Sequence, residues 1–374
     1  MKKILFLLSA LCTTYFLQAQ GMDTIPMPIP LPSGTAAGTA PFDRAYYPLN
    51  FYPIDHQLNI GYLGNLKTAR ESYLFEAQPV VKLPFFNTIY KNMQQEKATP
   101  DAPFQEKLRL ATHAAYASFR PQLRMFANES MPVKTPSYKI GIGYQHFFAL
   151  NKTDAYGAIN GGRSRRYLAV AFETGHYSNG QAGAAFDENL VDGTPAADSL
   201  YRNINNHTDL AALLNRNSGN FSTNYTELMI KYLQVFHLRN SYALDWFSIA
   251  AGWTRYHNNL LYFIDIGGYS ENDIVLYGKN YYHLNLEYMY RFKDARCIDR
   301  IKLNLNYEYL YKPHASVTRS RIEFITGIYH KSNVGIYAKL ALGHDSYNYR
   351  FVDNISHWGI GLTYDLLPGL EFAR

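Results

Sequence analysis

Residues 281–292 have the sequence YYHLNLEYMYRF, and residues 300–311 have the sequence RIKLNLNYEYLY. Both segments alternate between apolar or aromatic residues and polar residues, as in Leu303-Asn304-Leu305. Because the side chains of a β-strand point alternately to its two faces, each segment predicts a strand with one apolar and one polar face. Each is also about as long as a tilted strand that crosses a membrane, whereas soluble strands have roughly five or six residues. Together they favour a membrane-spanning β-barrel.

The composition agrees with such a barrel. The chain has 374 residues, including 33 Tyr and 22 Phe, yet its mean hydropathy is only −0.27. In a membrane β-barrel only alternate residues of a strand contact lipid, and aromatic girdles mark the two interfaces. Many aromatic residues at a modest mean hydropathy are therefore expected. A soluble all-β protein could share this composition, so the strand length favours the membrane.

The same alternation recurs along the chain and predicts an all-β fold, a twelve-stranded antiparallel transmembrane β-barrel. The strands centre on residues 57–63, 73–84, 108–119, 138–148, 167–177, 224–236, 242–255, 281–292, 300–311, 319–330, 334–344 and 358–367. The third of these is also compatible with a helix. Short connections alternate with long ones, as expected of periplasmic turns and external loops, and the longest is residues 179–222.

The N-terminal residues predict export. Two lysines, an apolar run and a small residue at Ala19 indicate a secretory signal peptide over residues 1–19. Residues 20–46 are rich in Pro, Gly and Ala and predict an irregular periplasmic segment. Residues 47–374 then form the transmembrane β-barrel with its long external loops. The expected location is the bacterial outer membrane.

Charge and cysteine content argue against a nucleic-acid-binding protein and against a protein stabilised by disulfides. The net charge of +6 is dispersed rather than gathered in a basic stripe, so nucleic acid is not an expected partner. Removal of the signal peptide leaves Cys297 alone, so no intrachain disulfide can form.

A candidate site begins in the segment RRYLAVAFETGHYS, residues 165–178. The apolar Val170 and Phe172 share one strand face with His176 and Ser178, because their positions differ by even numbers. This face is predicted to contact lipid, near the outer end of the strand. Residues two apart lie about 6.8 Å from each other along a strand. An imidazole nitrogen can reach a serine oxygen across that gap.

The next strand, STNYTELMIKYLQVF at residues 222–236, presents another polar residue to lipid. Asn224 shares its face with Leu228 and Ile230 and lies at the outer end of that strand. Three polar residues on the lipid face of one rim are unfavourable in a purely structural barrel. They suit an enzyme whose substrate is the lipid.

These residue types fit an esterase. Ser178 would be the nucleophile and His176 the base that accepts its proton. The carboxamide of Asn224 would hold the histidine in one tautomer. The turn Asn179-Gly180 can offer a backbone N–H to an oxyanion. The structural alternative is that an H-x-S-N-G run at a rim is simply a solvated turn.

The opposite face of these two strands carries charge. Glu173, Glu227 and Lys231 alternate with the lipid-facing residues, so they are expected in a polar network inside the barrel. We assign them no catalytic part.

These motifs resemble the outer-membrane phospholipase A family. The run His176-Tyr177-Ser178-Asn179-Gly180 looks like that family's catalytic strand end, and Ser222-Thr223-Asn224 looks like its third catalytic position. Residues 47–62 resemble its first strand, and residues 342–367 resemble its last external loop and closing strand. The resemblance therefore covers nearly the whole mature chain, with the motifs in order.

The resemblance implies calcium-dependent hydrolysis of phospholipid acyl esters, of the A1, A2 and lysophospholipase types, and a homodimer active in the membrane. It assigns Ser178 as nucleophile, His176 as base, Asn224 as the residue that orients His176, and the Gly180 amide as oxyanion donor. The connection between the two catalytic strands is longer here than in the family.

The resemblance also implies ligands for Ca²⁺. Ser130 matches a family serine that supplies a backbone oxygen from the partner subunit, and Asn220 matches the family's serine ligand. Gln181 could add a carbonyl oxygen. Asp187 and Asp192 are further candidates in the long loop, although a charge cluster there also suits a solvated surface. Oxygen ligands suit a hard cation.

Two alternatives stay open on the sequence. A lipid A deacylase barrel also pairs histidine with serine on its outer face, but tends to orient the histidine with a carboxylate. The other alternative is a barrel without enzymatic activity, either a pore or a scaffold. Polar residues such as Asn285 and Glu308 could close so narrow a lumen by pairing.

Overall fold

The computed structural model describes residues 57–66, 73–87, 113–126, 133–150, 165–215, 217–239, 242–292, 297–346 and 356–365. The predicted signal peptide and the segment 20–46 lie outside the described residues, as does Ser130. The strands of the described part belong to a single antiparallel sheet, in which neighbours in sequence are neighbours in space.

The strands are long and their bounds agree with the predicted segments. They are β1 (Gln57–Asn65), β2 (Tyr73–Gln78), β3 (Val81–Asn87), β4 (His113–Phe126), β5 (Val133–Ala149), β6 (Arg165–Ser178), β7 (Ser222–Arg239), β8 (Tyr242–His257), β9 (Asn280–Arg291), β10 (Ile298–Tyr311), β11 (Ser320–His330), β12 (Val334–Gly343) and β13 (His357–Asp365).

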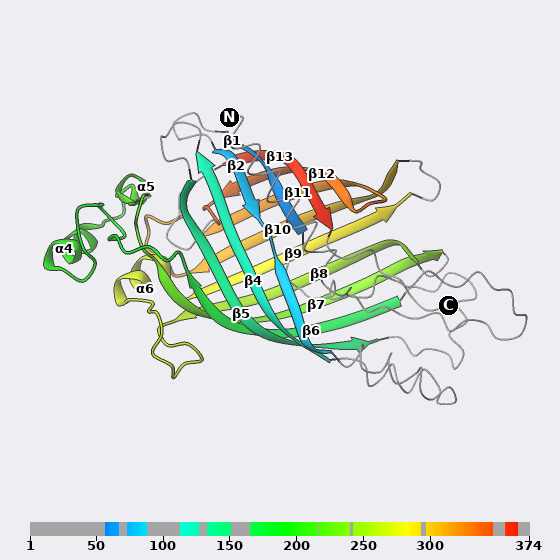
Figure 1. Cartoon of the computed structure of the whole chain (residues 1–374), viewed down its shortest axis with the longest axis horizontal. Helices are drawn as coiled ribbons and strands as arrows, with labels where there is room; N and C mark the ends of the chain where they lie inside the picture. The colour runs from blue at the N-terminus through cyan, green and yellow to red at the C-terminus, as the bar shows by residue number, and fades with distance from the viewer. Residues whose placement is uncertain are drawn as a thin grey trace, which may run out of the picture. The chain divides into compact units, whose positions relative to one another are not determined.

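The sheet closes on itself. β1 pairs with β13 on one side and with β2 on the other, and β2 also pairs with β4. β2 and β3 lie one after the other along β4, with a break at Pro79-Val80, so together they occupy one strand position. Counted in this way, the described residues form a closed twelve-stranded antiparallel barrel (Figure 1), which confirms the predicted fold class.

Two local expectations need correction. The third predicted strand is not a helix from His113 onward, and it runs on to Phe126. The two long loops after β6 and β8 are not wholly irregular, since they contain three helices: α4 (Pro195–Asn203), α5 (Leu210–Leu213) and α6 (Glu271–Tyr277). None of the helices in the described ranges is long and apolar enough to cross a membrane.

The outer surface of the barrel is apolar. Exposed and less exposed residues alternate along each strand, as in β12 and β13. The exposed outward residues include Ile140, Ile142, Phe172, Leu228, Ile230, Leu284, Leu303, Phe324, Ile336 and Ile360. An outward belt of this kind on a closed barrel is the surface that faces lipid. The protein is accordingly an outer-membrane β-barrel.

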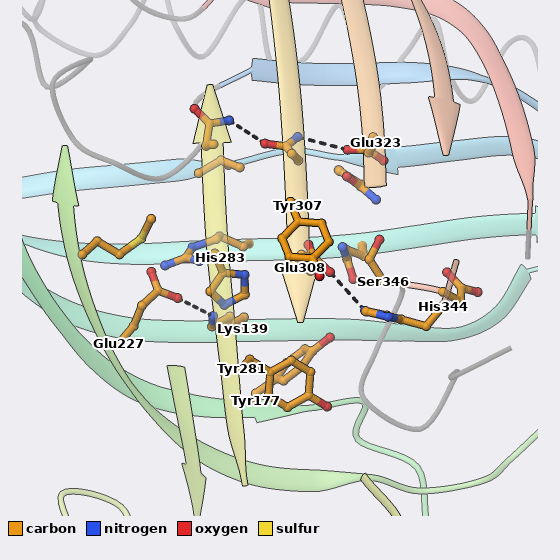
Figure 2. A pocket seen from close by; sticks show the side chains of 18 of the residues that line it. Lys139, Tyr177, Glu227, Tyr281, His283, Tyr307, Glu308, Glu323, His344 and Ser346 are labelled. Atoms are coloured by element: carbon orange, nitrogen blue, oxygen red, sulfur yellow. Dashed lines mark hydrogen bonds and ion pairs between the residues drawn. The ribbon is translucent and has the colours of Figure 1, made fainter. Parts of the chain in front are cut away.

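The inside of the barrel is polar and filled by side chains, as predicted. Glu173 accepts hydrogen bonds from Tyr225 at 2.7 Å and from Tyr116 at 3.1 Å. Lys139 and Glu227 form an ion pair at 3.2 Å. Lys139 and Glu227 line a cavity of about 320 Å³, which Figure 2 shows with His283 also beside it. Such pairing leaves small spaces rather than a wide channel.

A buried ion pair lies at the outer end of this lumen. Both Nη atoms of Arg124 donate to the carboxylate of Asp345, at 2.5 and 2.8 Å. Burial would raise the pKa of the Asp345 carboxyl, but the adjacent guanidinium outweighs this effect and holds that pKa at about 2. The pair therefore stays ionised at neutral pH and links β4 to the segment after β12.

The loop segments form a cap over the same end of the barrel. The inward aromatic residues at the outer ends of β6, β7 and β8 are Tyr177, Tyr225 and Tyr256. They share one buried cluster with Phe186 of the long loop and Tyr269 before α6. Figure 1 shows α4, α5 and α6 together beyond one end of the strands. The long loop thus covers the lumen.

Candidate active site at the outer rim

The outer ends of β6 and β7 bring two of the predicted catalytic residues together. His176 and Asn224 are directly opposite each other in the antiparallel register. The Nδ1 atom of His176 lies 3.0 Å from the Oδ1 atom of Asn224, which is hydrogen-bond distance. Asn224 is fully buried and His176 is partly exposed. Ile140, opposite His176 on β5, is exposed, so the apolar belt reaches this point.

The hydrogen bonds of Asn224 determine the tautomer of His176. The Nδ2 atom of Asn224 donates to the carbonyl oxygens of Asn258, Ile266 (2.7 Å) and Gly267 (3.2 Å). An amide nitrogen donates only, so the Oδ1 atom must be the acceptor toward His176. Neutral His176 therefore carries its proton on Nδ1. The Nε2 atom is left as the base.

Ser178 lies two residues beyond His176 on the same strand face. Both residues line a cavity of about 480 Å³ at the rim, together with Gly180. Ser178 is partly exposed. The structure thus places Ser178 and His176 on one cavity, and hydrogen-bonds His176 to the carboxamide of Asn224.

The turn after Ser178 is held by the buried side chain of Asn179. Its Oδ1 atom accepts hydrogen bonds from the amides of Phe221 (3.0 Å) and Gln181 (3.2 Å), and its Nδ2 atom donates to Gly219 at 2.6 Å. Gly180 follows with φ of +66°, a conformation that favours glycine. Asn179 thereby ties the two ends of the long loop together beside the cavity. The sequence analysis gave it no such part.

The residues considered as calcium ligands do not all lie together. Gln181, Asn220 and Asp192 line the same cavity as Ser178. Asp187 is exposed, is not among the cavity's lining residues, and accepts hydrogen bonds from Asn189. Ser130 lies outside the described residues. In the part of the chain that the structure describes, no three His, Cys, Asp or Glu side chains converge as a metal site.

The donor chemistry of the cavity is compatible with calcium nonetheless. Gln181 and Asn220 can offer amide oxygens, and Asp192 a carboxylate that also accepts from the amide of Ala185 at 3.2 Å. Calcium binds hard oxygen ligands of these kinds together with water. A site of this composition holds few charges, so its affinity for the ion would be modest.

Two other histidines have the same H-x-S spacing but a different geometry. His314 lies 2.8 Å from Ser316, and His330 lies 3.0 Å from Ser332, measured between Nδ1 and Oγ. In both pairs Nδ1 faces the serine, whereas in His176 this atom faces Asn224. The carboxamide of Asn224 and the adjacent cavity distinguish His176 and Ser178 from these two pairs.

The loop between β8 and α6 completes the site and was not anticipated. Its residue Gly267 has φ of +59° and packs so closely that a Cβ atom there would collide with His176 and with Ser222. The carbonyl groups around Asn224 come from the same loop. The only signal in the sequence is the pair Gly267-Gly268, which marks a turn without revealing its neighbours.

Comparisons with known proteins assign neither a family nor an activity to the chain. No family model and no curated protein matches the chain. The outer membrane phospholipase A from Escherichia coli is 11% identical, with a TM-score of 0.44 over 83% of this chain and 92% of that one. The Salmonella typhi outer membrane phospholipase dimer with bound calcium is 12% identical, with a TM-score of 0.40 over 83% and 90%. The KdgM porin is 8% identical, with a TM-score of 0.31 over 83% and 98%. These similarities include enzymes and a porin.

Proposed function

We propose that the protein is an outer-membrane phospholipase that hydrolyses phospholipid acyl esters with Ser178, His176 and Asn224. The observation that carries this proposal is the hydrogen bond between His176 Nδ1 and Asn224 Oδ1 on the lipid-facing rim, beside Ser178. It gives the imidazole the tautomer that a general base for the hydroxyl needs.

In the first half of the reaction Ser178 Oγ attacks the ester carbonyl carbon while its proton passes to His176 Nε2. The carbonyl oxygen becomes an oxyanion, and the Gly180 N–H would donate a hydrogen bond to it. The imidazolium then gives its proton to the leaving lysophospholipid oxygen as the carbon–oxygen bond breaks. Ser178 remains esterified by the fatty acid.

In the second half water replaces the lysophospholipid. His176 Nε2 accepts a proton from the water, whose oxygen attacks the acyl carbon, and the proton then returns to Ser178 Oγ as fatty acid leaves. A bound calcium ion, held by Gln181, Asn220 and Asp192, would supply positive charge near the oxyanion. Homodimerisation in the membrane is a further part of the proposal that the resemblance suggests.

Two observations favour this activity over the alternatives. The group that orients His176 is a carboxamide, whereas lipid A deacylases tend to use a carboxylate. The lumen is crossed by ion pairs, including that of Arg124 with Asp345, and its outer end lies under the cap, which does not favour a pore. The products of lipid cleavage distinguish the two enzymes directly.

The test is fatty-acid release from phosphatidylethanolamine in mixed detergent micelles with calcium, for the wild type, Ser178→Ala and His176→Ala. We expect both variants to lose nearly all activity. The matched control is Ser332→Ala, because Ser332 also lies beside a histidine at H-x-S spacing but in the turn between β11 and β12, at the other end of the barrel. It should retain the wild-type rate.

Calcium and the dimer are tested in the same assay. Removal of calcium by a chelator should reduce the rate and its return should restore it, while chemical cross-linking before electrophoresis reports dimers. Equal rates for the wild type and Ser178→Ala would refute the proposed function.

A further inference from the structure

The loop that surrounds Asn224 carries an exposed apolar projection. Residues 259–266, NLLYFIDI, leave the barrel after β8 and return at Gly267. We call this segment the apolar finger. Its side chains Tyr262, Phe263 and Ile266 are exposed, and Phe263 is 75% exposed.

The apolar finger is an ordered element. Leu260 and Ile264 exchange both backbone hydrogen bonds, at 2.8 and 2.9 Å, and form an isolated antiparallel bridge. Leu261 and Tyr262 at its tip have φ of +53° and +69°, which is unfavourable for residues other than glycine. Backbone strain of this kind persists where the surrounding contacts maintain it, and it is common at functional sites.

The base of the apolar finger lies on the lipid-facing side of β7 and β8. The ring of Tyr262 stacks on His257, with centroids 4.2 Å apart. His257 Nε2 is 3.0 Å from the hydroxyl of Thr226, which shares its strand face with Asn224 and Leu228. The exposed side chains therefore project from the same surface as the apolar belt.

The two ends of the apolar finger hold the catalytic carboxamide. Asn224 Nδ2 donates to Asn258, just before the finger, and to Ile266 and Gly267 at its return. These are the hydrogen bonds that direct Asn224 Oδ1 to His176. The position of the finger and the orientation of the imidazole are therefore linked through a single side chain.

We propose that the apolar finger inserts among the acyl chains of the outer leaflet, and that insertion keeps Asn224 in the orientation that makes His176 a base. The occupant is lipid because the finger continues the belt that already faces lipid, and because its one charged residue, Asp265, is next to the end that rejoins the barrel. Insertion removes apolar side chains from water, which is favourable. The effect of insertion on Asn224 and His176 rests on the proposed function.

Insertion is measured with an environment-sensitive fluorophore. Cys12 and Cys297, the two cysteines of the chain, are replaced by Ser, and a nitrobenzoxadiazole label is attached at Phe263→Cys. The matched control is Val275→Cys on α6, which is 65% exposed in the cap. In phosphatidylcholine vesicles with brominated acyl chains we expect quenching at 263 and none at 275.

Solvent-like emission at position 263, without quenching, would overturn the inference. Emission at 263 that changes with the ratio of protein to lipid, without quenching by bromine, would instead place a second copy of the chain on the finger and would also overturn it.

The link to Asn224 is measured with Phe263→Asp. Because an aspartate cannot enter the acyl chains as a Phe side chain can, we expect fatty-acid release from vesicles to fall roughly tenfold or more. Hydrolysis of a water-soluble short-chain nitrophenyl ester should change less than about twofold, because no bilayer is involved. Val275→Asp should leave both rates unchanged. An unchanged vesicle rate for Phe263→Asp would refute the link.

The proposed function and the inference about the apolar finger can be refuted independently. If no form of the protein hydrolyses ester, the proposed function is wrong, and quenching at position 263 still decides whether the finger inserts. If the esterase is active and position 263 is not quenched, the inference alone is wrong.

Discussion

At the residue scale, the environment of Asn224 explains why a carboxamide is present rather than a carboxylate. Its Oδ1 atom faces His176 and its Nδ2 atom faces three carbonyl oxygens. A carboxylate would keep the first contact but would place a negative oxygen against those carbonyl groups. Only an amide offers both an acceptor to His176 and a donor to the carbonyl oxygens.

Asn224→Asp should therefore be less stable than Asn224→Ala. A buried carboxylate whose second oxygen faces carbonyl groups and has no donor costs at least about 1–3 kcal/mol, whereas alanine leaves space that water can enter. Thermal unfolding in detergent, followed by circular dichroism, measures the difference. Asn224→Ala should also lose roughly 100-fold in esterase rate, because the base is no longer oriented. Equal melting temperatures for the two variants would contradict this explanation.

Gly267 is the second residue whose identity the site requires. An alanine there would adopt an unfavourable φ and would push against His176 and Ser222. Gly267→Ala should fold as a barrel and lose about tenfold in esterase rate, since a displacement of the imidazole by a fraction of an ångström is costly. Gly268→Ala is the control, because a Cβ atom there has open space. Similar rates for the two variants would count against the packing argument.

The arrangement of the proposed catalytic residues could be predicted from the sequence, and that of the groups supporting them could not. Strand alternation and antiparallel register determine that His176 and Asn224 share a face and lie opposite each other. The carbonyl groups that hold Asn224 come from a loop after β8, distant from it in sequence. Such contacts depend on how the loop folds back, and no periodicity describes that.

At the element scale, the strands could be predicted from the alternation of apolar and polar residues, and the helices of the cap could not. Alternation located most strands to within a few residues, because a lipid-facing row and a polar row impose it, but β4 runs seven residues beyond the predicted end at 119. α4 and α6 were missed although both carry start signals: Thr194 caps α4 before Pro195, and Ser270 caps α6. Short helices inside loops are found by caps rather than by periodicity.

The cap should depend on Asn179. Asn179→Ala leaves the buried amide of Phe221 without its acceptor, which costs about 1–3 kcal/mol at this point of the loop. We expect faster proteolysis within residues 184–215 and a lower esterase rate, while the melting temperature of the barrel is maintained by its strands. Asn189→Ala is the exposed control. Unchanged proteolysis of Asn179→Ala would show that the loop does not depend on this side chain.

At the scale of the whole molecule, the interior of the barrel is filled by side chains, and its exterior carries the candidate site. The ion pairs Lys139–Glu227 and Lys231–Glu287 join inward side chains of β5 with β7 and of β7 with β9, and the cap covers the outer end of the lumen. The apolar belt and the candidate site lie on the other side of the same strands. This arrangement suits an enzyme that meets its substrate from within the membrane.

A filled barrel should not conduct ions. In planar bilayers the purified protein is expected to give no steady single-channel steps, whereas an open porin under the same conditions does. Stable conductance steps in the absence of esterase activity would favour the pore and contradict the present account.

The most direct measurement is covalent labelling of the native protein in detergent with a radioactive aliphatic sulfonyl fluoride, followed by mass spectrometry of the peptides. The account predicts that Ser178 carries the label and that His176→Ala abolishes it, since the hydroxyl reacts only beside its base. Label on another serine, or equal labelling of Ser178 in the presence and absence of His176, would contradict the account.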